Sequence, residues 1–410
     1  MITFSIIRKS QLEGAQRLDA EYYQPEYLSR MQKLTISPTV ELQEIAYITD
    51  GEHGSPIWDE SSGIKYFSAQ HVKDCLIDES GANTISSIID ERNKRSRLQE
   101  GDILLSTVGT IGFAGLVTDN LLPANIDRHV ARIALNENTL DPEFLVAVLN
   151  SSYGRFQSIR ESTGNVQLNL FIDKIKKIRV PKNNNSAIAQ LVKLALQELS
   201  SSEKLYQQSE DLLLEELGLK DFIVEDDLNF VMNLSDVQSA NRVDADYFQP
   251  KYKNLESRIK NAEFRQLGEL VSMKKGFEPG SEAYQEEGKP FIRVSSLSRF
   301  GIEEKDQKYL KDELYEKLKN DFKPQVEEIL LTKDATPGIA YVLKESIEAI
   351  ISGGILRLKV KNDLDPEYLT LCINSIVGKM QVERDAGGSI IAHWKPEQIR
   401  NLLIEVPVSI

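Results

Sequence analysis

The sequence predicts a mixed α/β protein made of two tandem copies of one domain, joined by a long helix of the coiled-coil type. Three observations predict this architecture: the length of 410 residues, three sequence matches that recur in one order, and a heptad-spaced apolar strip between the copies. A chain of this length usually exceeds a single domain. We expect a first domain at 1–181, a helical spacer and linker at 182–235, and a second domain at 236–410.

The internal repeat rests on three pairs of segments. RLDAEYYQPEY at 17–27 returns as RVDADYFQPKY at 242–252, with seven of eleven positions identical. GDILLSTVGTIGFAG at 101–115 matches EEILLTKDATPGIAY at 327–341, and LDPEFLVAVLNSSYGRFQ at 140–157 matches LDPEYLTLCINSIVGKMQ at 364–381. The three offsets are 225, 226 and 224 residues. One order at nearly one offset indicates a tandem duplication.

Each copy has the same order of predicted elements. An opening rich in Tyr leads to a short helix at 27–34 or 252–259. Short β-type runs separated by Gly turns follow, such as DILLSTV and VARIAL in one copy and EILLTK and ILRLKV in the other. A helix opened by Asp-Pro comes next, since Asp suits the N-cap and Pro suits the first turn. A polar Gly loop, a short helix and a strand close each copy.

Residues 186–217 are predicted to form one continuous helix that Gly218 ends. An apolar strip recurs along it every seven residues and predicts pairing with another helix, as in a coiled coil. The alternative is a helix packed on its own domain. The strip consists of Leu191, Val192, Leu199, Leu205, Tyr206, Leu212 and Leu213.

The formal net charge of −14 would argue against a nucleic-acid partner if it were spread evenly. Residues 182–241, however, hold 11 Asp and Glu against 4 Lys and Arg, so half of the acidic excess lies in this segment. The flanking blocks are close enough to neutral to carry basic patches for phosphates. No run of about 18 apolar residues and no signal-peptide pattern is present, and Cys75 and Cys372 form no motif, so we expect a cytoplasmic protein.

The motifs of the common nucleic-acid enzymes are absent. The chain has no Pro-Pro pair for an amino-methyltransferase motif, no P-loop, no His or Cys at metal-ligand spacing and no nucleophile signature. The sequence therefore predicts binding rather than catalysis, with no catalytic residue, no metal and no cofactor.

The duplicated order resembles the two halves of a type I restriction-modification specificity subunit. The residues that carry the resemblance are the opening D-A-[ED]-Y-[YF]-Q-P-x-Y, the I-L-L-[ST] strand, the L-D-P-E-[FY]-L helix and the late Gly loop, each present twice. The resemblance covers essentially the whole chain and implies two target recognition domains that read the halves of a split double-stranded DNA site. It also implies methyltransferase subunits docked on the spacer region and restriction subunits that join them.

Two other classes of function remain open at this point. One is the recognition module of a fused or associated methyltransferase or nuclease of another restriction type, and the other is a protein-binding scaffold unrelated to DNA. The chain also departs from the family in one respect. The family has a second spacer helix after the second domain, whereas this chain reaches Ile410 three residues after Pro407. We therefore expect the strip at 186–217 to be exposed or to mediate self-association.

DNA recognition divides into phosphate contacts that position the protein and base-edge contacts that specify the sequence. For phosphates we select the basic clusters Arg92, Lys94, Arg95 and Arg97 in the first copy and Lys274, Lys275 and Lys289 in the second. For base edges we select polar loop residues, with a solvated surface as the alternative for each. They are Gln70, His71, Arg128, Asn165, Gln167 and Asn169 in the first copy and Arg293, Ser295, Arg299, His393 and Lys395 in the second.

The two copies share their frame but differ in the loops between the elements. GEHGSPIWDESSG in the first copy faces KKGFEPGSEAYQEEG in the second, and GNVQLN faces GGSIIAHW. Divergent loops on a shared frame predict that each domain reads a different short sequence. The Tyr-rich openings occur in both copies, so we expect them to serve as scaffold or partner contacts rather than to stack on bases.

Overall fold

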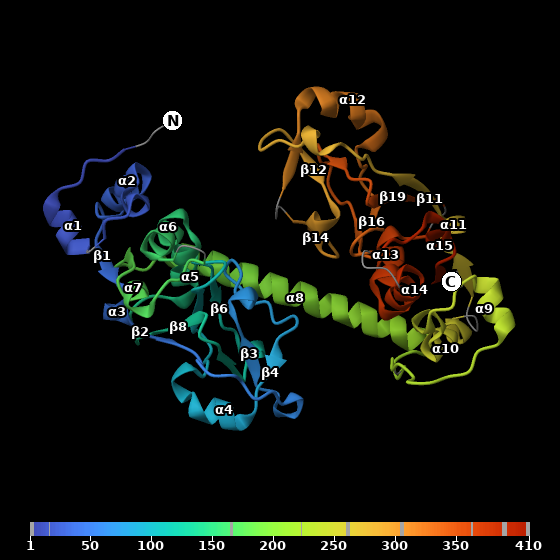
Figure 1. Cartoon of the computed structure of the whole chain (residues 1–410), viewed down its shortest axis with the longest axis horizontal. Helices are drawn as coiled ribbons and strands as arrows, with labels where there is room; N and C mark the ends of the chain where they lie inside the picture. The colour runs from blue at the N-terminus through green and yellow to red at the C-terminus, as the bar shows by residue number, and fades with distance from the viewer. Residues whose placement is uncertain are drawn as a thin grey trace. The chain divides into compact units, whose positions relative to one another are not determined.

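The computed structural model describes residues 4–15, 17–164, 167–222, 224–259, 263–303, 307–361, 364–387 and 392–406. The chain divides into two compact units, Met1–Ser202 and Glu203–Ile410, which we name unit 1 and unit 2. The division falls inside the long helix α8 (Ser186–Glu216) (Figure 1). The predicted mixed α/β class and the continuous spacer helix are confirmed. The domain limits expected from the sequence stay predictions.

Three sheets lie within the described residues of unit 1. The largest is an antiparallel sheet in the order β2-β8-β5-β6, and beside it lies a smaller sheet in the order β4-β3-β7, in which β3 and β7 are parallel. The strands are β1 (Thr39–Glu41), β2 (Ala46–Asp50), β3 (Lys65–Phe67), β4 (Asn83–Thr84), β5 (Ile103–Ser106), β6 (Ala114–Leu116), β7 (Ala124–Ile126), β8 (Val130–Leu135) and β9 (Arg179–Pro181), with β1 paired to β9. The helices are α1 (Lys9–Ala15), α2 (Pro25–Leu34), α3 (Leu42–Ile45), α4 (Ser87–Arg92), α5 (Pro142–Asn150), α6 (Ser152–Glu161) and α7 (Ile172–Ile175).

Unit 2 repeats these sheets in the orders β11-β19-β16-β17 and β15-β12-β18, and it adds a short hairpin, β13-β14. The strands are β10 (Phe264–Gln266), β11 (Val271–Lys275), β12 (Lys289–Ile292), β13 (Leu297–Ser298), β14 (Gly301–Ile302), β15 (Lys308–Leu310), β16 (Ile329–Thr332), β17 (Ala340–Val342), β18 (Ile350–Ile351), β19 (Ile355–Val360) and β20 (Leu403–Glu405), with β10 paired to β20. The helices are α9 (Leu234–Ala240), α10 (Pro250–Ile259), α11 (Leu267–Leu270), α12 (Asp312–Phe322), α13 (Pro366–Asn374), α14 (Ile376–Ala386) and α15 (Pro396–Arg400).

The strand registers of the two units correspond. Leu105 of β5 lies opposite Ala131 of β8, and Leu331 of β16 lies opposite Leu356 of β19, at the offsets found in the sequence. The central strands β5 and β16 are buried along their whole length, as expected of an uninterrupted I-L-L run. Ile103 and Leu105 pack in the core that contains α5, whereas Leu104 packs in the core that contains the smaller sheet. Burying each such side chain contributes about 1.5–3 kcal/mol.

Two amides that recur in both copies close the edges of these sheets. The side chain of Asn150 bonds the backbone N–H and C=O of Ala114 on β6, and Asn374 bonds Ala340 on β17 in the same way. Gln157 bonds both backbone groups of Arg179 on β9, and its counterpart Gln381 bonds those of Leu403 on β20. Each amide satisfies backbone groups that would otherwise be buried without a partner.

Helix α8 packs on both units, each through its own half. Ala189 and Val192 join the core of unit 1, and Leu213 joins the core of unit 2. The strip predicted from the heptad pattern is therefore divided. Val192 and Leu213 pack on the chain itself, and Tyr206 is half-buried against the ring of Phe300, whereas Leu191, Leu205 and Leu212 are exposed and Leu199 lies at the border. The heptad pattern identified the helix correctly, and its exposed residues Leu191, Leu205 and Leu212 remain the predicted pairing surface.

Candidate nucleic-acid interface

Four loops of unit 1 meet at one edge of the large sheet, where β2 and β5 end and β8 begins. We name this surface the loop edge of unit 1 and define it by residues 51–54, 107–112, 127–129 and 167–169. Main-chain bridges tie the loops together, because Glu52 pairs with Asp127 and Val108 pairs with Asn169. The side chains of the loops are thus presented from a shared backbone frame.

Unit 2 has an equivalent loop edge, defined by residues 276–280, 333–338, 352–354 and 392–395. Phe277 pairs with Ser352, and Asp334 pairs with His393, at offsets of 224–226 residues from the bridges of unit 1. The backbone frame is therefore repeated, whereas the side chains that it carries differ between the units.

The first loop of unit 1 is anchored by charged groups. The Asp50 carboxylate accepts a hydrogen bond from Arg95 Nη1 at 2.8 Å and pairs with His53 Nε2 at 2.8 Å. Burial alone would raise the pKa of Asp50, but the bonds to His53 and Arg95 outweigh it and hold the pKa below its ordinary value. Arg95 also donates to the carbonyl of Gly51 at 3.1 Å, so it serves to hold this loop.

Arg128 projects from the turn between β7 and β8. The neighbouring Asp127 accepts from the backbone N–H of His129 at 2.8 Å and pairs with the ring Nδ1 of His129 at 3.0 Å. Arg128 itself is exposed, with its Nε 3.2 Å from His129 Nε2. A tight turn therefore carries an exposed guanidinium, the group that most often reads guanine in a groove.

Asp334 is the carboxylate that pairs with basic side chains at the loop edge of unit 2. It pairs with His393 Nδ1 at 2.8 Å and with Lys333 Nζ at 2.5 Å, and these bonds lower the pKa of its carboxyl although burial opposes them. The 352–354 loop packs closely on the turn after β12, since a Cβ added at Gly354 would lie 2.7 Å from Val294 Cγ2. Arg293 and Ser295 belong to that turn and therefore lie beside this loop edge.

Several residues selected from the sequence come together at these edges. Gln70 and Ser295 take equivalent exposed positions just after β3 and β12. Asn165 lies outside the described residues. The selected residues on the loop edges themselves are Arg128, Gln167 and Asn169 in unit 1 and His393 and Lys395 in unit 2.

Two selected residues lie where base contact is not favoured. His71 is buried, its Nδ1 accepts from the backbone N–H of Ser68 at 2.9 Å, and desolvation lowers its pKa. Reaching a base would require removing this side chain from the core. Arg299 lies on the β13–β14 hairpin, and its guanidinium stacks over the ring of Tyr206 at 4.9 Å, which directs it to α8 rather than to the loop edge.

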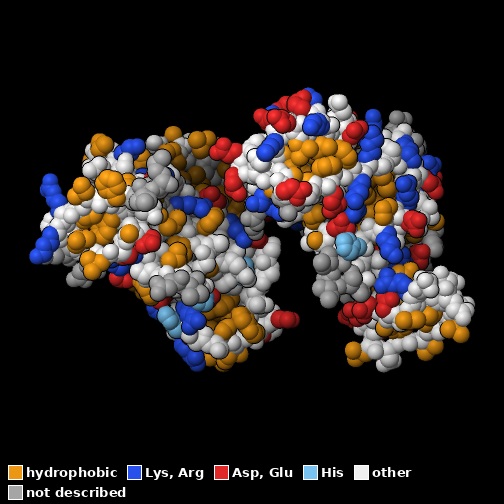
Figure 2. Space-filling model, turned by 45° about the horizontal axis from the view of Figure 1, so that its top comes forward, with side chains coloured by type: hydrophobic (Ala, Val, Ile, Leu, Met, Phe, Trp, Pro, Cys, Tyr) orange, Lys and Arg blue, Asp and Glu red, His pale blue; other side chains and the backbone are white. Residues whose placement is uncertain are grey.

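The basic clusters selected for phosphates are largely paired with carboxylates. Glu91 pairs with Lys94 and Arg97 at 2.7 Å each, and these contacts lower its pKa to about 2. In unit 2, Lys275 pairs with Glu278 at 3.4 Å and Lys289 pairs with Glu348. The exposed residues Arg92 and Lys274 have no ion pair within the described part of the chain. Figure 2 shows basic and acidic side chains interspersed on the face it displays, so no extended basic patch dominates there.

His393 was selected from the sequence, whereas the two histidines of the loop edge of unit 1, His53 and His129, were missed. His53, His129 and His393 are three of the four histidines in the chain, and each bonds an aspartate of its loop edge. An imidazole oriented by a carboxylate can offer its second nitrogen to a phosphate or a base edge. The short spacing of Asp50 to His53 and of Asp127 to His129 was the signal in the sequence that could have identified these two histidines.

Other functional features are limited within the part of the chain that the structure describes. No group of three His, Cys, Asp or Glu side chains there is placed to hold a metal ion. Among the helices there, none combines the length and the apolar character needed to cross a bilayer. Tyr22 and Tyr23 are buried, which favours a scaffold role over base stacking for the Tyr-rich opening.

Comparison with known proteins gives matches to type I specificity proteins and, among the solved structures, also to the type IIG restriction endonuclease BpuSI, with a TM-score of 0.33 at 13% identity, covering 43% of this chain and 28% of that one. Residues 259–409 match the family model of the type I restriction modification DNA specificity domain. A stretch of 123 residues, 30% of this chain, is 31% identical to the type I restriction enzyme EcoBI specificity subunit of Escherichia coli, and the match spans about a quarter (26%) of that relative. The solved S subunit of the type I restriction-modification system from M. genitalium has a TM-score of 0.42 at 14% identity, covering 89% of this chain and 83% of that one. The HsdS subunit from Thermoanaerobacter tengcongensis has a TM-score of 0.27 at 13% identity, covering 90% and 84%.

Proposed function

We propose, from the premise that residues 259–409 belong to the type I restriction modification DNA specificity domain family, that the whole chain is a DNA-sequence-recognition subunit. Unit 1 joins this family through the duplication, since its sheets and registers repeat those of unit 2. In this function each unit reads one half of a split double-stranded DNA site. Methylation and cleavage are carried out by partner methyltransferase and restriction subunits, and the chain supplies no catalytic group of its own.

One observation carries the proposal: the two loop edges share their backbone bridges but differ in their side chains. Glu52–Asp127 and Val108–Asn169 in unit 1 correspond to Phe277–Ser352 and Asp334–His393 in unit 2. A frame kept constant under variable polar side chains is what two different base sequences require, because the frame sets position and the base-edge contacts set identity. A scaffold for a single protein ligand would have no reason to vary these side chains.

The interspersed charges of the chain fit recognition by a few directed contacts better than binding through a broad basic surface. Arg128 and Asn169 in unit 1 and His393 and Lys395 in unit 2 are the side chains that we assign to base edges or phosphates. Arg92 and Lys274 are the exposed cations that we assign to phosphates. Few phosphate contacts predict a shallow dependence of affinity on salt, since each neutralised phosphate adds about 0.9 to the slope of log K against log salt.

Selection of bound fragments from a random DNA pool tests this function. The chain is assembled with its cognate methyltransferase subunit, and bound fragments are sequenced. We expect enrichment of two short sequences separated by a constant gap. The variant Arg128→Ala should relax one of the two sequences, and the exposed control Ile36→Asp should change neither. Failure to enrich any sequence, or enrichment of one uninterrupted sequence, would overturn the proposal.

A further inference from the structure

One loop of each loop edge follows directly from the end of a helix. In unit 1, α6 ends at Glu161, and the chain then leads to residues 167–169 of the loop edge. In unit 2, α14 ends at Ala386, and the chain then leads to residues 392–395. The place where each helix ends therefore helps to set the position of the polar side chains that these residues carry.

Backbone hydrogen bonds fix the far end of this loop in unit 1. The N–H of Thr163 donates to the carbonyl of Asn169 at 2.9 Å, and the N–H of Asn169 donates to the carbonyl of Thr163 at 2.8 Å. The N–H of Leu170 donates to the carbonyl of Thr107, just after β5, at 2.9 Å. We name this segment the reading stem of unit 1 and define it by residues 162–164 and 167–170. Because its far end is tied to the sheet, the orientation of the stem depends on what holds its near end at Ser162.

An arginine near the N-terminus of the chain holds that near end. Arg17 Nη1 donates to the carbonyl of Ser162 at 3.2 Å. It also donates to the carbonyls of Arg160 and Glu161 at 3.4 Å each. Nε and Nη2 of the same guanidinium bond the two carboxylate oxygens of Asp19 at 2.8 and 2.6 Å. The two-point pairing fixes the plane of the guanidinium, and a cation is favourable at a helix C-terminus because the helix dipole is negative there.

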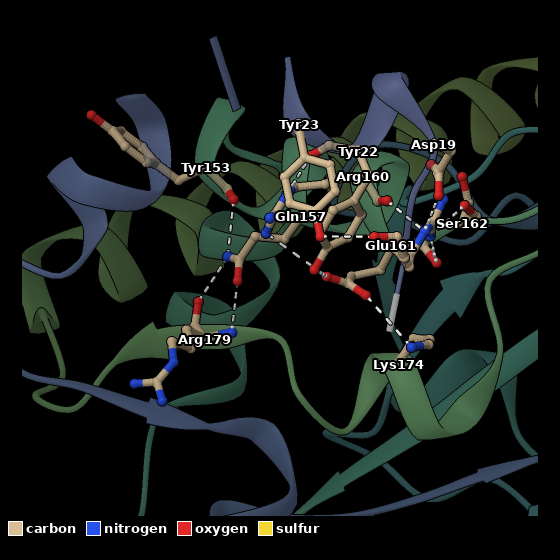
Figure 3. A network of polar contacts seen from close by, with 11 residues as sticks. Asp19, Tyr22, Tyr23, Tyr153, Gln157, Arg160, Glu161, Ser162, Lys174 and Arg179 are labelled. Atoms are coloured by element: carbon tan, nitrogen blue, oxygen red, sulfur yellow. Dashed lines mark hydrogen bonds and ion pairs between the residues drawn. The ribbon is translucent and has the colours of Figure 1, made fainter. Parts of the chain in front are cut away.

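Tyr22 joins the same helix end from a second side (Figure 3). The guanidinium groups of Arg17 and Arg160 lie 4.7 and 3.8 Å from the centre of its ring. Its hydroxyl donates to Glu161 at 2.8 Å, and its carbonyl accepts from Arg160 Nε at 3.0 Å. Burial and the bond to Glu161 raise the pKa of Tyr22 to about 12, so the hydroxyl stays protonated and remains a donor at neutral pH.

The clamp is repeated in unit 2. Arg242 bonds both carboxylate oxygens of Asp244, at 2.9 and 2.5 Å. It donates to the carbonyls of Asp385 and Gly387, at 3.4 and 3.2 Å, around the end of α14. Its guanidinium lies 4.4 Å from the centre of the Tyr247 ring. The same pair of side chains therefore holds the corresponding helix end in both units.

The far end of the loop in unit 2 is tied to its sheet as in unit 1. The N–H of Trp394 donates to the carbonyl of Lys333, just after β16, at 2.8 Å. We name this segment the reading stem of unit 2 and define it by residues 385–387 and 392–395. The two stems share their anchors, whereas the side chains that they present, such as Asn169 and His393, differ.

Another arginine makes the same kind of contact at the opposite end of α6. Arg30 of α2 pairs with Glu26 at 2.6 Å and donates to the carbonyl of Ser152, in the first turn of α6, at 3.1 Å. That end of the helix adjoins α5 and does not lead to the loop edge. At the offset of 225 residues, Arg30 corresponds to Leu255, so this contact is not repeated in unit 2. The arginine that both units keep is the one beside the reading stem.

Neither kept arginine is placed to contact DNA itself. The side chain of Arg17 is 14% exposed and that of Arg242 is 23% exposed. Their guanidinium groups bond a carboxylate and backbone carbonyls, and binding a phosphate would require breaking these bonds. Any effect of the two residues on DNA recognition must therefore act through the stems.

We propose that Arg17 and Arg242 are positioning residues for base recognition, each of which fixes the reading stem of its own unit. The inference rests on the proposed function, which assigns the side chains of the stems to DNA. Contact geometry must be held within about 0.5 Å by groups behind the contacting side chains. The clamp is kept in both units because it sets position, and the stem side chains differ because they set identity.

The test measures how well each half-site is discriminated, by fluorescence anisotropy of the chain assembled with its cognate methyltransferase subunit. The probes are the enriched split site and two DNAs in which one half is scrambled. Arg17→Met should lower discrimination of the half that Arg128→Ala relaxes by about tenfold, the contribution of one base contact, and leave the other half and unrelated DNA unchanged. Arg242→Met should do the reverse. The matched control Arg30→Met should change neither half.

Hydrogen exchange of the same variants reports on the stem itself. Peptides covering 162–170 should exchange faster in Arg17→Met, while those of β5 keep their rate. Arg17→Lys keeps a cation that can bond Asp19 or a carbonyl, so it should recover part of the discrimination. Asp19→Asn weakens the pairing that orients the guanidinium and should give a smaller loss in the same half. This variant decides the question if Arg17→Met unfolds unit 1.

The two proposals fail in different ways. A split site read with unchanged discrimination by the variants of Arg17 and Arg242 overturns the inference. A loss in both halves from either variant also overturns it, and so does an equal loss from Arg30→Met, because that result would indicate general destabilisation of the unit. A wild-type complex that reads no split site refutes the proposed function, and the inference with it.

Discussion

Replacing Arg132 with Met should destabilise unit 1 and loosen its loop edge. The guanidinium of Arg132 on β8 bonds both carboxylate oxygens of Asp102, at 2.6 and 3.2 Å, and both side chains are almost fully buried. A third bond joins Arg132 Nη1 to the carbonyl of Arg95 at 3.0 Å. Because Arg95 in turn holds Asp50 and Gly51, the variant should disturb the first recognition loop as well as the core.

The magnitude follows from the burial of the pair. Met fills much of the volume of Arg but leaves the carboxylate of Asp102 buried without a counter-ion, which costs about 3–5 kcal/mol of unfolding free energy. With a urea m-value of about 2 kcal/mol/M, the transition midpoint of unit 1 should fall by about 1.5–2.5 M. Trp58 lies in unit 1 and Trp394 in unit 2, so tryptophan fluorescence reports on both units.

The loss of unfolding free energy in Arg132→Met should depend on pH, and the direction of this dependence follows from the pKa of Asp102. Burial already raises the pKa of Asp102, against the pull of Arg132, and removing Arg132 raises it further. A carboxyl group whose folded pKa is raised favours the folded state at low pH, and this contribution is lost as pH rises through the folded pKa. The deficit of the variant should therefore be smaller at pH 5 than at pH 8.

A double variant separates the unpaired charge from lost packing. Adding Asp102→Leu to Arg132→Met removes both ions, so most of the lost stability should return. The equivalent pair in unit 2, Arg357 with Glu328 at 3.1 Å, supplies a matched control, since Arg357→Met should destabilise unit 2 and leave the Trp58 signal unchanged. A loss below about 1 kcal/mol, or a double variant no more stable than the single one, would refute the reasoning.

Three further predictions concern recognition, the spacer helix and the thiols. Arg128→Ala should weaken binding to the specific site by about 1–3 kcal/mol in fluorescence anisotropy and leave binding to unrelated DNA nearly unchanged. Arg92→Ala with Lys274→Ala should weaken binding to both kinds of DNA and flatten the salt dependence of the affinity. The opposite pattern would contradict the assignment of Arg128 to base edges and of Arg92 and Lys274 to phosphates. Leu205→Asp with Leu212→Asp should reduce self-association in sedimentation, and Val192→Asp should instead unfold unit 1. A wild-type chain that is monomeric at all concentrations would contradict the prediction that the exposed leucines of α8 pair with a second copy. Burial raises the pKa of Cys372 to about 12, so this thiol should resist a disulfide reagent at pH 8 until the chain unfolds; prompt labelling of native Cys372 would contradict its burial.

The fold was largely predictable because its signals are local and most of them occur twice. The I-L-L strands, the Asp-Pro helix starts and the heptad spacing each depend on residues near one another in the chain. The duplication supported the strands and the helix starts, whereas the heptad spacing occurs only in α8. Asn150 and Gln157 stood in the repeated segment, but their function as edge caps depends on strands that lie elsewhere in the sequence. The sequence likewise could not predict which residues of the apolar strip on α8 are buried, because this depends on which face of the helix each unit covers.

The candidate site was predictable only in part, because it is assembled from distant loops. Arg128 and Asn169 are 41 positions apart in sequence and share one loop edge only through the sheet. His71 looked like an exposed polar tip, but a backbone bond turns it into the core. The pairing of Lys94 with Glu91 was available from sequence, since residues three apart on a helical turn are neighbours. The acidic neighbour Glu91 therefore reduces the net positive charge of this basic cluster.

Exchange of one unit between related specificity subunits tests the central claim most directly. Residues 1–181 are replaced by the corresponding block of a related subunit, the chimera is expressed with the methyltransferase, and methylated positions are read across the genome. The account predicts that one half of the methylated site changes while the other half and the gap are kept, because each loop edge reads its own half. A chimera that rewrites both half-sites, or that changes neither, would contradict the account.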